Sequence, residues 1–299
     1  MRITIIGAGS VGMLIASFLA EQNINVTLIV RRKEQALEIQ KFGLIRKNLD
    51  GSFYTAKIQV ETDFSSIKED SLVIVAVKYG QLKPLYKTLK TLNIESPLLF
   101  LQNGLAHFQE ALRLPQKTIA FGACQFGAEK ESDHIVVHRG QGVLKLAVEK
   151  GQKELFKKLA STLDGKIQLV MEEDAEQMLF EKALLNCFIN PITAIVQMKN
   201  GQLIENQYTY QLLLNLYDEL MEAFPEKRED FQFEDVKNLC IKTAANTSSM
   251  LSDRLQMRPT EAETIIGEVI QRAAKREKPL PTLTTLYHLL LAIESGEKM

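Results

Sequence analysis

The sequence predicts an α/β protein in which an N-terminal, doubly wound sheet of the Rossmann type precedes an all-α C-terminal domain. Three observations predict this fold class. Short β-branched runs alternate with helical patterns over residues 1–120, a glycine-rich motif follows the first run, and helical periodicity dominates from Glu172 onward. Because the composition changes near Gly165 and 299 residues exceed one typical core, we expect domains over residues 1–165 and 166–299.

The N-terminal half is expected to contain buried parallel strands with helices between them. The expected strands are Arg2–Ile6, Val26–Val30, Leu72–Val77 and Pro97–Leu101. The expected helices are Val11–Gln22, Lys33–Lys41 and Gln81–Leu92. This alternation supplies the crossover connections that parallel strands require.

Turn signals predict a hairpin and a further set of strands. Asp50 and Gly51 lie between two short arms, Leu44–Lys47 and Phe53–Ile58, which is typical of a β-hairpin. We also expect an antiparallel extension of the main sheet, formed by Thr118–Cys124, His134–His138 and Val143–Val148.

The C-terminal half shows helical periodicity with few β-branched runs. The expected helices are Glu172–Met198, Tyr208–Ala223, Phe233–Leu251, Thr260–Glu277 and Thr282–Ser295. Pro279 and Pro281 stop one helix and start the next. We expect this domain to bind the substrate and to form a homodimer.

Charge and composition exclude several classes of protein. Lys and Arg number 36 against 37 Asp and Glu, a net charge of −1 that gives no electrostatic case for nucleic acid or for an anionic membrane. Polar residues interrupt the apolar stretches well short of the ~20 residues that a membrane helix needs.

Cysteine usage and the start of the chain indicate the compartment. The three cysteines are far apart and form no CxxC pair, and no charged-then-apolar leader precedes the first strand, so we expect a cytoplasmic protein. The four histidines show no spacing typical of metal ligands, so no metal site is expected. Of the four, only His107, which follows Asn103 and Gly104 closely, could approach the expected ligand site, and Cys187 is interpreted as core packing.

A glycine motif follows the first strand directly and predicts dinucleotide binding. It fits GxGxxG in its meaningful context of strand, tight turn and helix. Gly7 permits the turn, Gly9 lets the backbone approach a pyrophosphate, and Gly12 lets the helix pack on the strand. The helix N-terminus supplies N–H donors for the phosphate. The expected cofactor-binding loop is Gly7, Ala8, Gly9, Ser10, Val11 and Gly12. The alternative is a glycine-rich packing turn without a ligand.

The end of the second strand favours NADP(H) over NAD(H). Strand Val26–Val30 is followed by Arg31 and Arg32, and no carboxylate occurs until Glu34. An acid at this position accepts from a ribose 2′-OH, whereas a guanidinium binds a 2′-phosphate through paired charged hydrogen bonds. The alternative is that the two arginines only solvate the strand end.

Two further strand ends point to the same edge of the sheet. Lys78 follows the strand Leu72–Val77, and Asn103 follows Pro97–Leu101. Because ligands bind beyond the carboxyl ends of parallel strands, we expect Lys78 to contact the cofactor and Asn103 to contact cofactor and substrate.

A polar stripe occurs on the first long helix of the C-terminal half. Lys182, Asn186 and Asn190 are spaced i, i+4, i+8 and so share one face of an otherwise apolar helix. A buried lysine and buried amides need polar partners, which a bound substrate would provide. For an isolated helix, bonds to neighbouring loops would explain the stripe equally well.

In order along the chain, these motifs resemble the ketopantoate reductase (2-dehydropantoate 2-reductase) family. The matching segments are Gly7–Gly12, Arg31, Val77-Lys78, Gln102-Asn103-Gly104, Lys182 to Ala194 with its two asparagines, Asn246-x-x-Ser249-Met250-x-x-Asp253 and Arg258-Pro259-Thr260-Glu261. The resemblance implies reduction of the 2-keto group of ketopantoate by NADPH to give pantoate, a step toward pantothenate and coenzyme A.

The resemblance also implies residue roles. Lys182 is similar to the family's catalytic lysine, acting as general acid, and Glu261 to its carboxylate companion. The implied substrate-binding residues are Asn103, Lys182, Asn186, Asn190, Asn246, Ser249 and Glu261.

One position departs from the family pattern and leaves the substrate open. Ile266 stands where the family usually has Asn. A related NADP-dependent dehydrogenase acting on another 2-oxo acid or on a 3-hydroxy acid therefore remains an alternative. A non-catalytic NADP-sensing protein is a second alternative, although the Lys182 stripe would be superfluous in a sensor.

Overall fold

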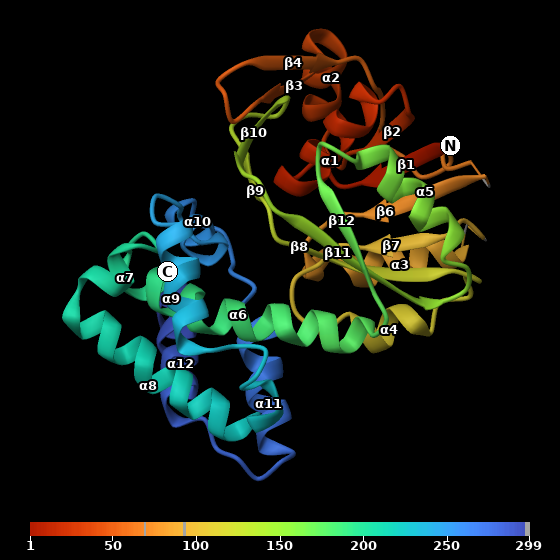
Figure 1. Ribbon diagram of the computed structural model, residues 1–299. Coiled ribbons are helices and arrows are strands. Elements are labelled where there is room, and N and C mark those ends of the chain that lie inside the picture. Colours follow the sequence, from red (N-terminus) through yellow and green to blue (C-terminus); the bar gives the residue numbers. More distant parts are fainter. Residues whose placement is uncertain (69, 92–93, 297–299) are drawn as a thin grey trace. The chain divides into compact units, whose positions relative to one another are not determined.

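A computed structural model describes residues 1–68, 70–91 and 94–296, and the chain divides into two compact units (Figure 1). Unit 1 comprises residues 1–102 and 107–179, and unit 2 comprises residues 103–106 and those from Phe180 onward. The chain passes between the units within helix α6 (Ala175–Val196), later than the boundary expected at residue 165. The reason is an additional strand, β12 (Gln168–Glu172), which pairs with β11 and keeps this segment in unit 1.

The sheet of unit 1 confirms the expected doubly wound fold. In the described part of the chain, eight strands pair in the order β12-β11-β8-β7-β6-β1-β2-β5. Their bounds are β1 Arg2–Ile6, β2 Asn25–Ile29, β5 Gln59–Glu61, β6 Ser71–Val75, β7 Leu98–Phe100, β8 Ile119–Cys124 and β11 Val143–Lys150, besides β12. All neighbours run parallel except β11 and β8.

Helices with apolar faces pack on this sheet. They are α1 (Ser10–Glu21), α2 (Lys33–Phe42), α3 (Leu82–Thr91), α4 (Phe108–Leu112) and α5 (Glu154–Leu163). The first three confirm the expected helices, and Leu92, the expected last residue of the third, lies outside the described residues. Strand β6 is buried along its whole length, as a strand covered on both faces should be.

A second sheet corrects one expectation. Strands β3 (Leu44–Lys47) and β4 (Phe53–Ala56) form the expected antiparallel hairpin. Strand β10 (Ile135–Gly140) does not extend the main sheet: it pairs parallel to β3 and antiparallel to β9 (Gly127–Lys130). The close passage of the chain from one sheet to the other needs glycine, because a Cβ at Gly142 would lie 1.9 Å from the carbonyl oxygen of Gln125.

Unit 2 is helical, as expected. Besides α6, its helices are α7 (Gln202–Glu205), α8 (Gln207–Ala223), α9 (Phe233–Lys242), α10 (Ser249–Leu255), α11 (Glu268–Ala274) and α12 (Pro281–Gly296). A π-helical turn, Glu263–Gly267, precedes α11. Helix α6 is long and apolar enough to cross a membrane by length and composition alone, but 72% of its apolar window is buried inside the protein, which is typical of a core helix.

The single helix expected over Phe233–Leu251 is wrong. Helix α9 ends at Lys242, where the Thr243 hydroxyl donates to the Leu239 carbonyl, 2.6 Å away. Ser248 caps the next helix, because its Oγ accepts from the Leu251 N–H at 3.1 Å. Local side-chain hydrogen bonds therefore outweigh helix propensity in the segment between these two residues.

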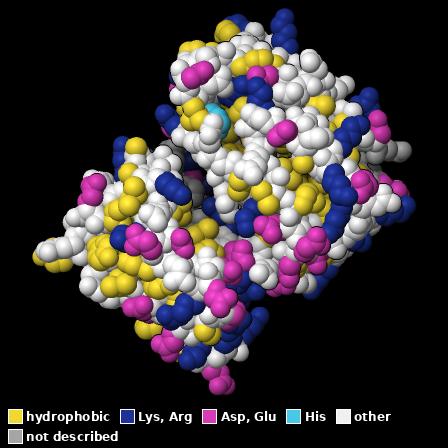
Figure 2. All heavy atoms as spheres, in the orientation of Figure 1, with side chains coloured by type: hydrophobic (Ala, Val, Ile, Leu, Met, Phe, Trp, Pro, Cys, Tyr) yellow, Lys and Arg dark blue, Asp and Glu magenta, His cyan; other side chains and the backbone are white. Residues whose placement is uncertain are grey.

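Charged side chains are distributed without a dominant sign. On the face in Figure 2, basic and acidic side chains are interspersed over the surface of each unit. This distribution agrees with the net charge of −1.

Candidate nucleotide and substrate sites

The glycine loop of unit 1 has the geometry that the sequence predicts. Gly7 has φ +110°, and a Cβ there would lie 2.9 Å from the Ala76 carbonyl carbon. A Cβ at Gly12 would lie 2.0 Å from the Gly7 carbonyl oxygen, so only glycine allows α1 to pack this closely. A Cβ at Gly9, in contrast, would meet nothing within 4 Å. Gly9 is thus not required by the protein's own packing, and it leaves open space in front of the loop.

That open space adjoins free backbone donors. Gly9 is the N-cap residue of α1, and none of the side chains that the structure describes caps this end of the helix. The first N–H groups of a helix have no intrahelical partner and carry a partial positive charge. An open cradle at an uncapped N-terminus fits a bound phosphate group.

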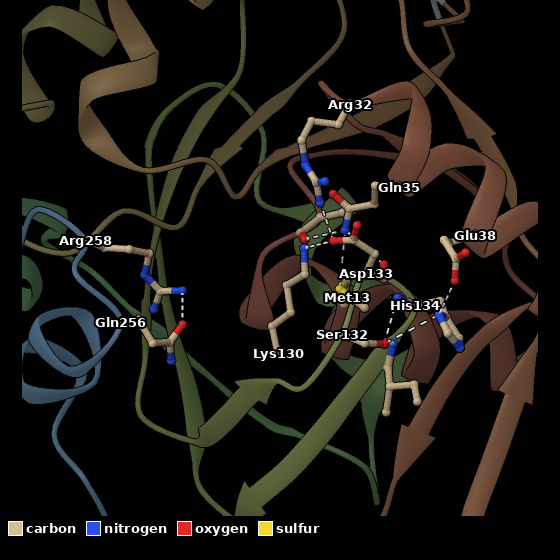
Figure 3. A network of polar contacts seen from close by, with 12 residues as sticks. Met13, Arg32, Gln35, Glu38, Lys130, Ser132, Asp133, His134, Gln256 and Arg258 are labelled. Atoms are coloured by element: carbon tan, nitrogen blue, oxygen red, sulfur yellow. Dashed lines mark hydrogen bonds and ion pairs between the residues drawn. The ribbon is translucent and has the colours of Figure 1, made fainter.

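The arginines at the end of β2 differ in their surroundings. Both Arg31 and Arg32 are exposed. The Arg32 guanidinium donates to the carboxylate of Asp133, in the turn between β9 and β10, and Lys130 Nζ lies 2.9 Å from the same carboxylate (Figure 3). Burial would raise the pKa of Asp133, but hydrogen bonds from Lys130 and Arg32 outweigh it and hold that pKa below its usual value.

The buried side chain of Gln35 joins this turn to the glycine loop. Gln35 Nε2 donates to the Ala8 carbonyl at 3.1 Å and to the Asp133 carbonyl at 3.0 Å (Figure 3). Asp133 is separated from Arg32 by 101 residues, and no sequence motif marks it. Only the pairing of the second sheet brings it to the end of β2, which is why sequence reasoning missed it.

Lys78 lies on a loop whose backbone accepts hydrogen bonds from a buried side chain. It follows β6 and is exposed. Gln102 Nε2 donates to the carbonyls of Val75 and Val77, at 3.0 and 2.8 Å. Gln102 is itself buried and belongs to unit 1. It therefore fixes the segment that presents Lys78, a supporting role that its position beside Asn103 did not reveal.

In unit 2, Asn103 and Glu261 form a direct pair. Asn103 Nδ2 donates to Glu261 Oε2 at 2.9 Å. The backbone behind them is tightly packed: a Cβ at Gly104 would lie 2.0 Å from the Thr264 carbonyl oxygen, and the Leu105 N–H donates to that same oxygen. Glu261 also lies just before the π-helical turn Glu263–Gly267, and such irregular turns occur frequently at functional sites.

The polar face of α6 is largely buried. Asn186 and Asn190 are 9% and 6% exposed, whereas Lys182 is partly exposed. Asn190 Nδ2 donates to Ser249 Oγ at 3.3 Å, joining two of the predicted substrate-binding residues. Asn246 lies nearby in sequence and accepts a backbone hydrogen bond from the Asn200 N–H at its carbonyl oxygen. The helical spacing places Lys182, Asn186 and Asn190 on one face, with Lys182 two turns from the Asn190–Ser249 pair.

Two reactive side chains are held inert by burial. His107 is 0% exposed, and desolvation lowers its pKa to about 3, so its ring is neutral. Cys187 is fully buried within α6, and burial raises the pKa of its thiol. Ile266, the position that departs from the family pattern, is also fully buried. The structure places these three residues in the cores of their units.

Comparison with known proteins assigns the family. The sequence profile described as "Ketopantoate reductase PanE/ApbA" matches residues 3–150, and its companion, "Ketopantoate reductase PanE/ApbA C terminal", matches residues 174–294. The chain belongs to the ketopantoate reductase family. This family assignment makes the protein an oxidoreductase, and it agrees with the predicted order of motifs.

Individual relatives of this ketopantoate reductase family member match along nearly its whole length. It is 35% identical to the 2-dehydropantoate 2-reductase of Listeria monocytogenes, covering 98% of this chain and 97% of that protein. A crystal structure described as a probable 2-dehydropantoate 2-reductase from Bacillus subtilis is 31% identical, with a TM-score of 0.83 over 98% of this chain and 100% of that one. A D-mandelate dehydrogenase solved with NADH and anilino(oxo)acetate shares the fold, with a TM-score of 0.86 at 22% identity and 100% coverage of both chains.

Proposed function

We propose that the protein catalyses the NADPH-dependent reduction of 2-dehydropantoate (ketopantoate) to (R)-pantoate, a cytoplasmic step toward pantothenate and coenzyme A. The observation that carries the proposal is the similarity along nearly the whole chain to relatives named 2-dehydropantoate 2-reductase. The open glycine loop beside two arginines supports a dinucleotide with a 2′-phosphate. The lysine and amides of α6 support a small, polar keto acid.

The residues that would hold the cofactor lie mainly in unit 1. Gly9 leaves room for the pyrophosphate, and the N–H groups at the start of α1 would donate to it. Arg31 and Arg32 would bind the 2′-phosphate, and Lys78 and Asn103 would contact the nicotinamide half. The donor set fits an anionic dinucleotide because every charged member is a cation.

Lys182 is the general acid in this proposal. When bound, the cofactor supplies a hydride to the 2-keto carbon, and negative charge then develops on the keto oxygen. The Lys182 ammonium stabilises that charge and transfers a proton to the oxygen, so that the carbonyl becomes a hydroxyl. Glu261 would accept a hydrogen bond from a substrate hydroxyl while its other contact fixes the Asn103 amide.

The remaining polar residues would select the substrate. Asn186, Asn190, Asn246 and Ser249 offer amides and a hydroxyl, which bind polar substrate groups and reject analogues that leave these groups unpaired. The Asn190–Ser249 hydrogen bond fixes one amide before the substrate arrives. We also propose a homodimer formed through the helical domain, which analytical ultracentrifugation would test.

Oxidation of NADPH by the purified protein tests the proposal. Ketopantoate would be compared with a panel of other 2-keto acids, and NADH would be run in parallel with NADPH. Lys182→Ala should lower turnover by ~10²-fold or more while NADPH binding stays nearly unchanged. The matched control is Lys199→Ala, which removes an exposed lysine of the same unit and should leave turnover unchanged.

The outcomes separate the parts of the proposal. A ketopantoate rate far above the rest, lost in Lys182→Ala, supports both the substrate and the acid. Faster reduction of another keto acid overturns the substrate assignment and retains the reaction class. Wild-type turnover in Lys182→Ala removes Lys182 from the mechanism.

A further inference from the structure

The end of β2 lacks a carboxylate in the sequence but has one in the structure. Residues 31–33 are all basic, and the usual acid of an NAD site is missing. The fold supplies an acid from elsewhere: Asp133, in the β9–β10 turn, accepts a hydrogen bond from Arg32 and forms an ion pair with Lys130 (Figure 3). The end of β2 therefore carries both an arginine, which suits the 2′-phosphate of NADP(H), and a carboxylate, which suits the ribose 2′-OH of NAD(H).

A buried side chain fixes the position of Asp133 relative to the glycine loop. Gln35 is buried, with 6% of the residue exposed, so the position of its side chain is fixed by packing. Its single amide nitrogen contacts the carbonyls of Ala8 and Asp133 at 3.1 and 3.0 Å. The carboxylate turn and the glycine loop thus share one buried hydrogen-bond donor, and all of these residues lie in unit 1.

The Arg32–Asp133 pair remains open to a ligand. The side chains of Arg32 and Asp133 are 45% and 25% exposed, so a phosphate can reach the guanidinium from solvent. Asp133 is ionised at neutral pH because its two cationic neighbours keep its pKa low. A 2′-phosphate that binds Arg32 would therefore compete with a carboxylate already bound there.

We propose that Asp133 determines nucleotide specificity: it competes with the 2′-phosphate for Arg32 and supplies an acceptor for a ribose 2′-OH, so that it weakens the preference for NADPH over NADH. This inference rests on the proposed function, because it requires that the glycine loop binds a nicotinamide dinucleotide. Physically, the carboxylate repels the anionic 2′-phosphate and reduces the net positive charge around it, whereas it attracts a neutral hydroxyl.

The alternative role for the pair is purely structural. In that case Arg32 and Asp133 would only fasten the β9–β10 turn to α2. Removal of the charge would then lower the melting temperature without changing the ratio of the two dissociation constants. The two roles are distinguished by binding measurements.

Asp133→Asn is the variant that tests the proposal. Asparagine keeps the size and an acceptor oxygen and removes the charge. Titration of the full-length protein with NADPH and with NADH, followed by nicotinamide fluorescence, gives both dissociation constants. The ratio Kd(NADH)/Kd(NADPH) should rise about 10-fold, and the rise should shrink at high ionic strength.

Glu131→Gln is the matched control. Glu131 lies two residues away on the same turn and forms an ion pair with Lys47 at 2.6 Å. Its substitution changes the net charge of the protein by the same amount as Asp133→Asn. It should leave the ratio unchanged. Asp133→Ser serves as a second variant if the asparagine protein unfolds, and the melting temperature of each variant establishes that it is folded.

Arg32→Gln distinguishes failure of the inference from failure of the proposed function. If Arg32→Gln weakens NADPH binding but neither Asp133 variant raises the ratio, the role of Asp133 is overturned and NADPH binding stands. A ratio that falls in Asp133→Asn also overturns it, because Asp133 would then support Arg32 instead of competing for it. If the wild-type protein binds neither dinucleotide, the proposed function fails first.

Discussion

His107 should make the stability of unit 1 depend on pH. Its ring is 0% exposed, and the ring centroids of Phe121 and Phe100 lie 5.5 and 6.2 Å away. Neither ring nitrogen has a hydrogen-bond partner among the described residues. Because nothing compensates for the loss of water, desolvation lowers the pKa from 6.5 to about 3. The perturbation that tests this is His107→Leu, which removes both polar atoms at a similar volume.

The sign and the size follow from the two pKa values. Between the folded value of about 3 and the unfolded value of 6.5, the unfolded chain binds a proton and the folded chain does not. His107 therefore does not reduce the free energy of unfolding through proton binding above pH 6.5. Below that pH the free energy of unfolding falls, because only the unfolded chain binds the proton. One pKa unit corresponds to about 1.4 kcal/mol, so lowering the pH from 7 to 5 should cost the wild-type protein about 2 kcal/mol at this residue.

Urea unfolding of the wild-type and His107→Leu proteins at pH 7 and pH 5 measures this difference. Groups other than His107 contribute nearly equally to both proteins, so the stability gap between them isolates this one. The variant should be the more stable protein, and its advantage should grow by about 2 kcal/mol on going to pH 5. His288→Leu, which removes an exposed histidine, controls for the substitution itself. An equal gap at both pH values would refute the reasoning.

Three substitutions in unit 1 test the glycine loop and the ion pair of the buried Arg46. Gly9→Ala should keep the wild-type melting temperature but weaken NADPH binding in a fluorescence titration by about 10-fold, because a Cβ there meets only the space in front of the loop. Gly12→Ala should lower the melting temperature by several degrees, since its Cβ would lie 2.0 Å from the Gly7 carbonyl oxygen; an unchanged value would contradict this geometry. Glu21→Gln should reduce the free energy of unfolding in urea by about 2 kcal/mol, because it leaves the buried Arg46 guanidinium without its 2.7 Å carboxylate partner.

The Glu21 effect should depend on pH in the usual sense for a carboxylate. Burial would raise the pKa of Glu21, but hydrogen bonds from Lys166 and Arg46 outweigh it and lower the pKa. The stabilisation is therefore present above the ordinary value of 4.5 and is lost as the pH falls below it. Wild-type protein and Glu21→Gln should converge in stability in acid, and a constant difference would exclude the ion pair as the cause.

Local patterns were sufficient for most of unit 1. The β-branched runs and the glycine motif predicted strands β1, β2, β6 and β7 within a residue or two, because a parallel strand buried on both faces must be apolar throughout. The glycines of the loop each have a physical reason that the sequence motif alone supplies. Their constraints are local, arising from one turn and one helix packed on one strand.

The errors occurred where non-local pairing or side-chain capping decided the structure. The run at His134–His138 is equally suited to either sheet, and only its pairing with β3 assigned it to the second one. The helix expected over Phe233–Leu251 is divided in two, and Ser248 caps the second helix. The helical periodicity of the sequence continues across this cap, so periodicity alone did not predict the break.

The fold class, the glycine loop, the cationic end of β2 and the polar face of α6 could all be predicted from the amino-acid sequence. Each of these depends on residues within one turn, one strand or one helix face, where spacing along the chain translates directly into geometry. Tertiary structure alone decided the partners. It brought Asp133 to Arg32 across 101 residues, Gln102 under the Lys78 loop, and Asn103 to Glu261 across 158 residues. Such contacts depend on how strands and helices pack against one another, and no local pattern of residues records them.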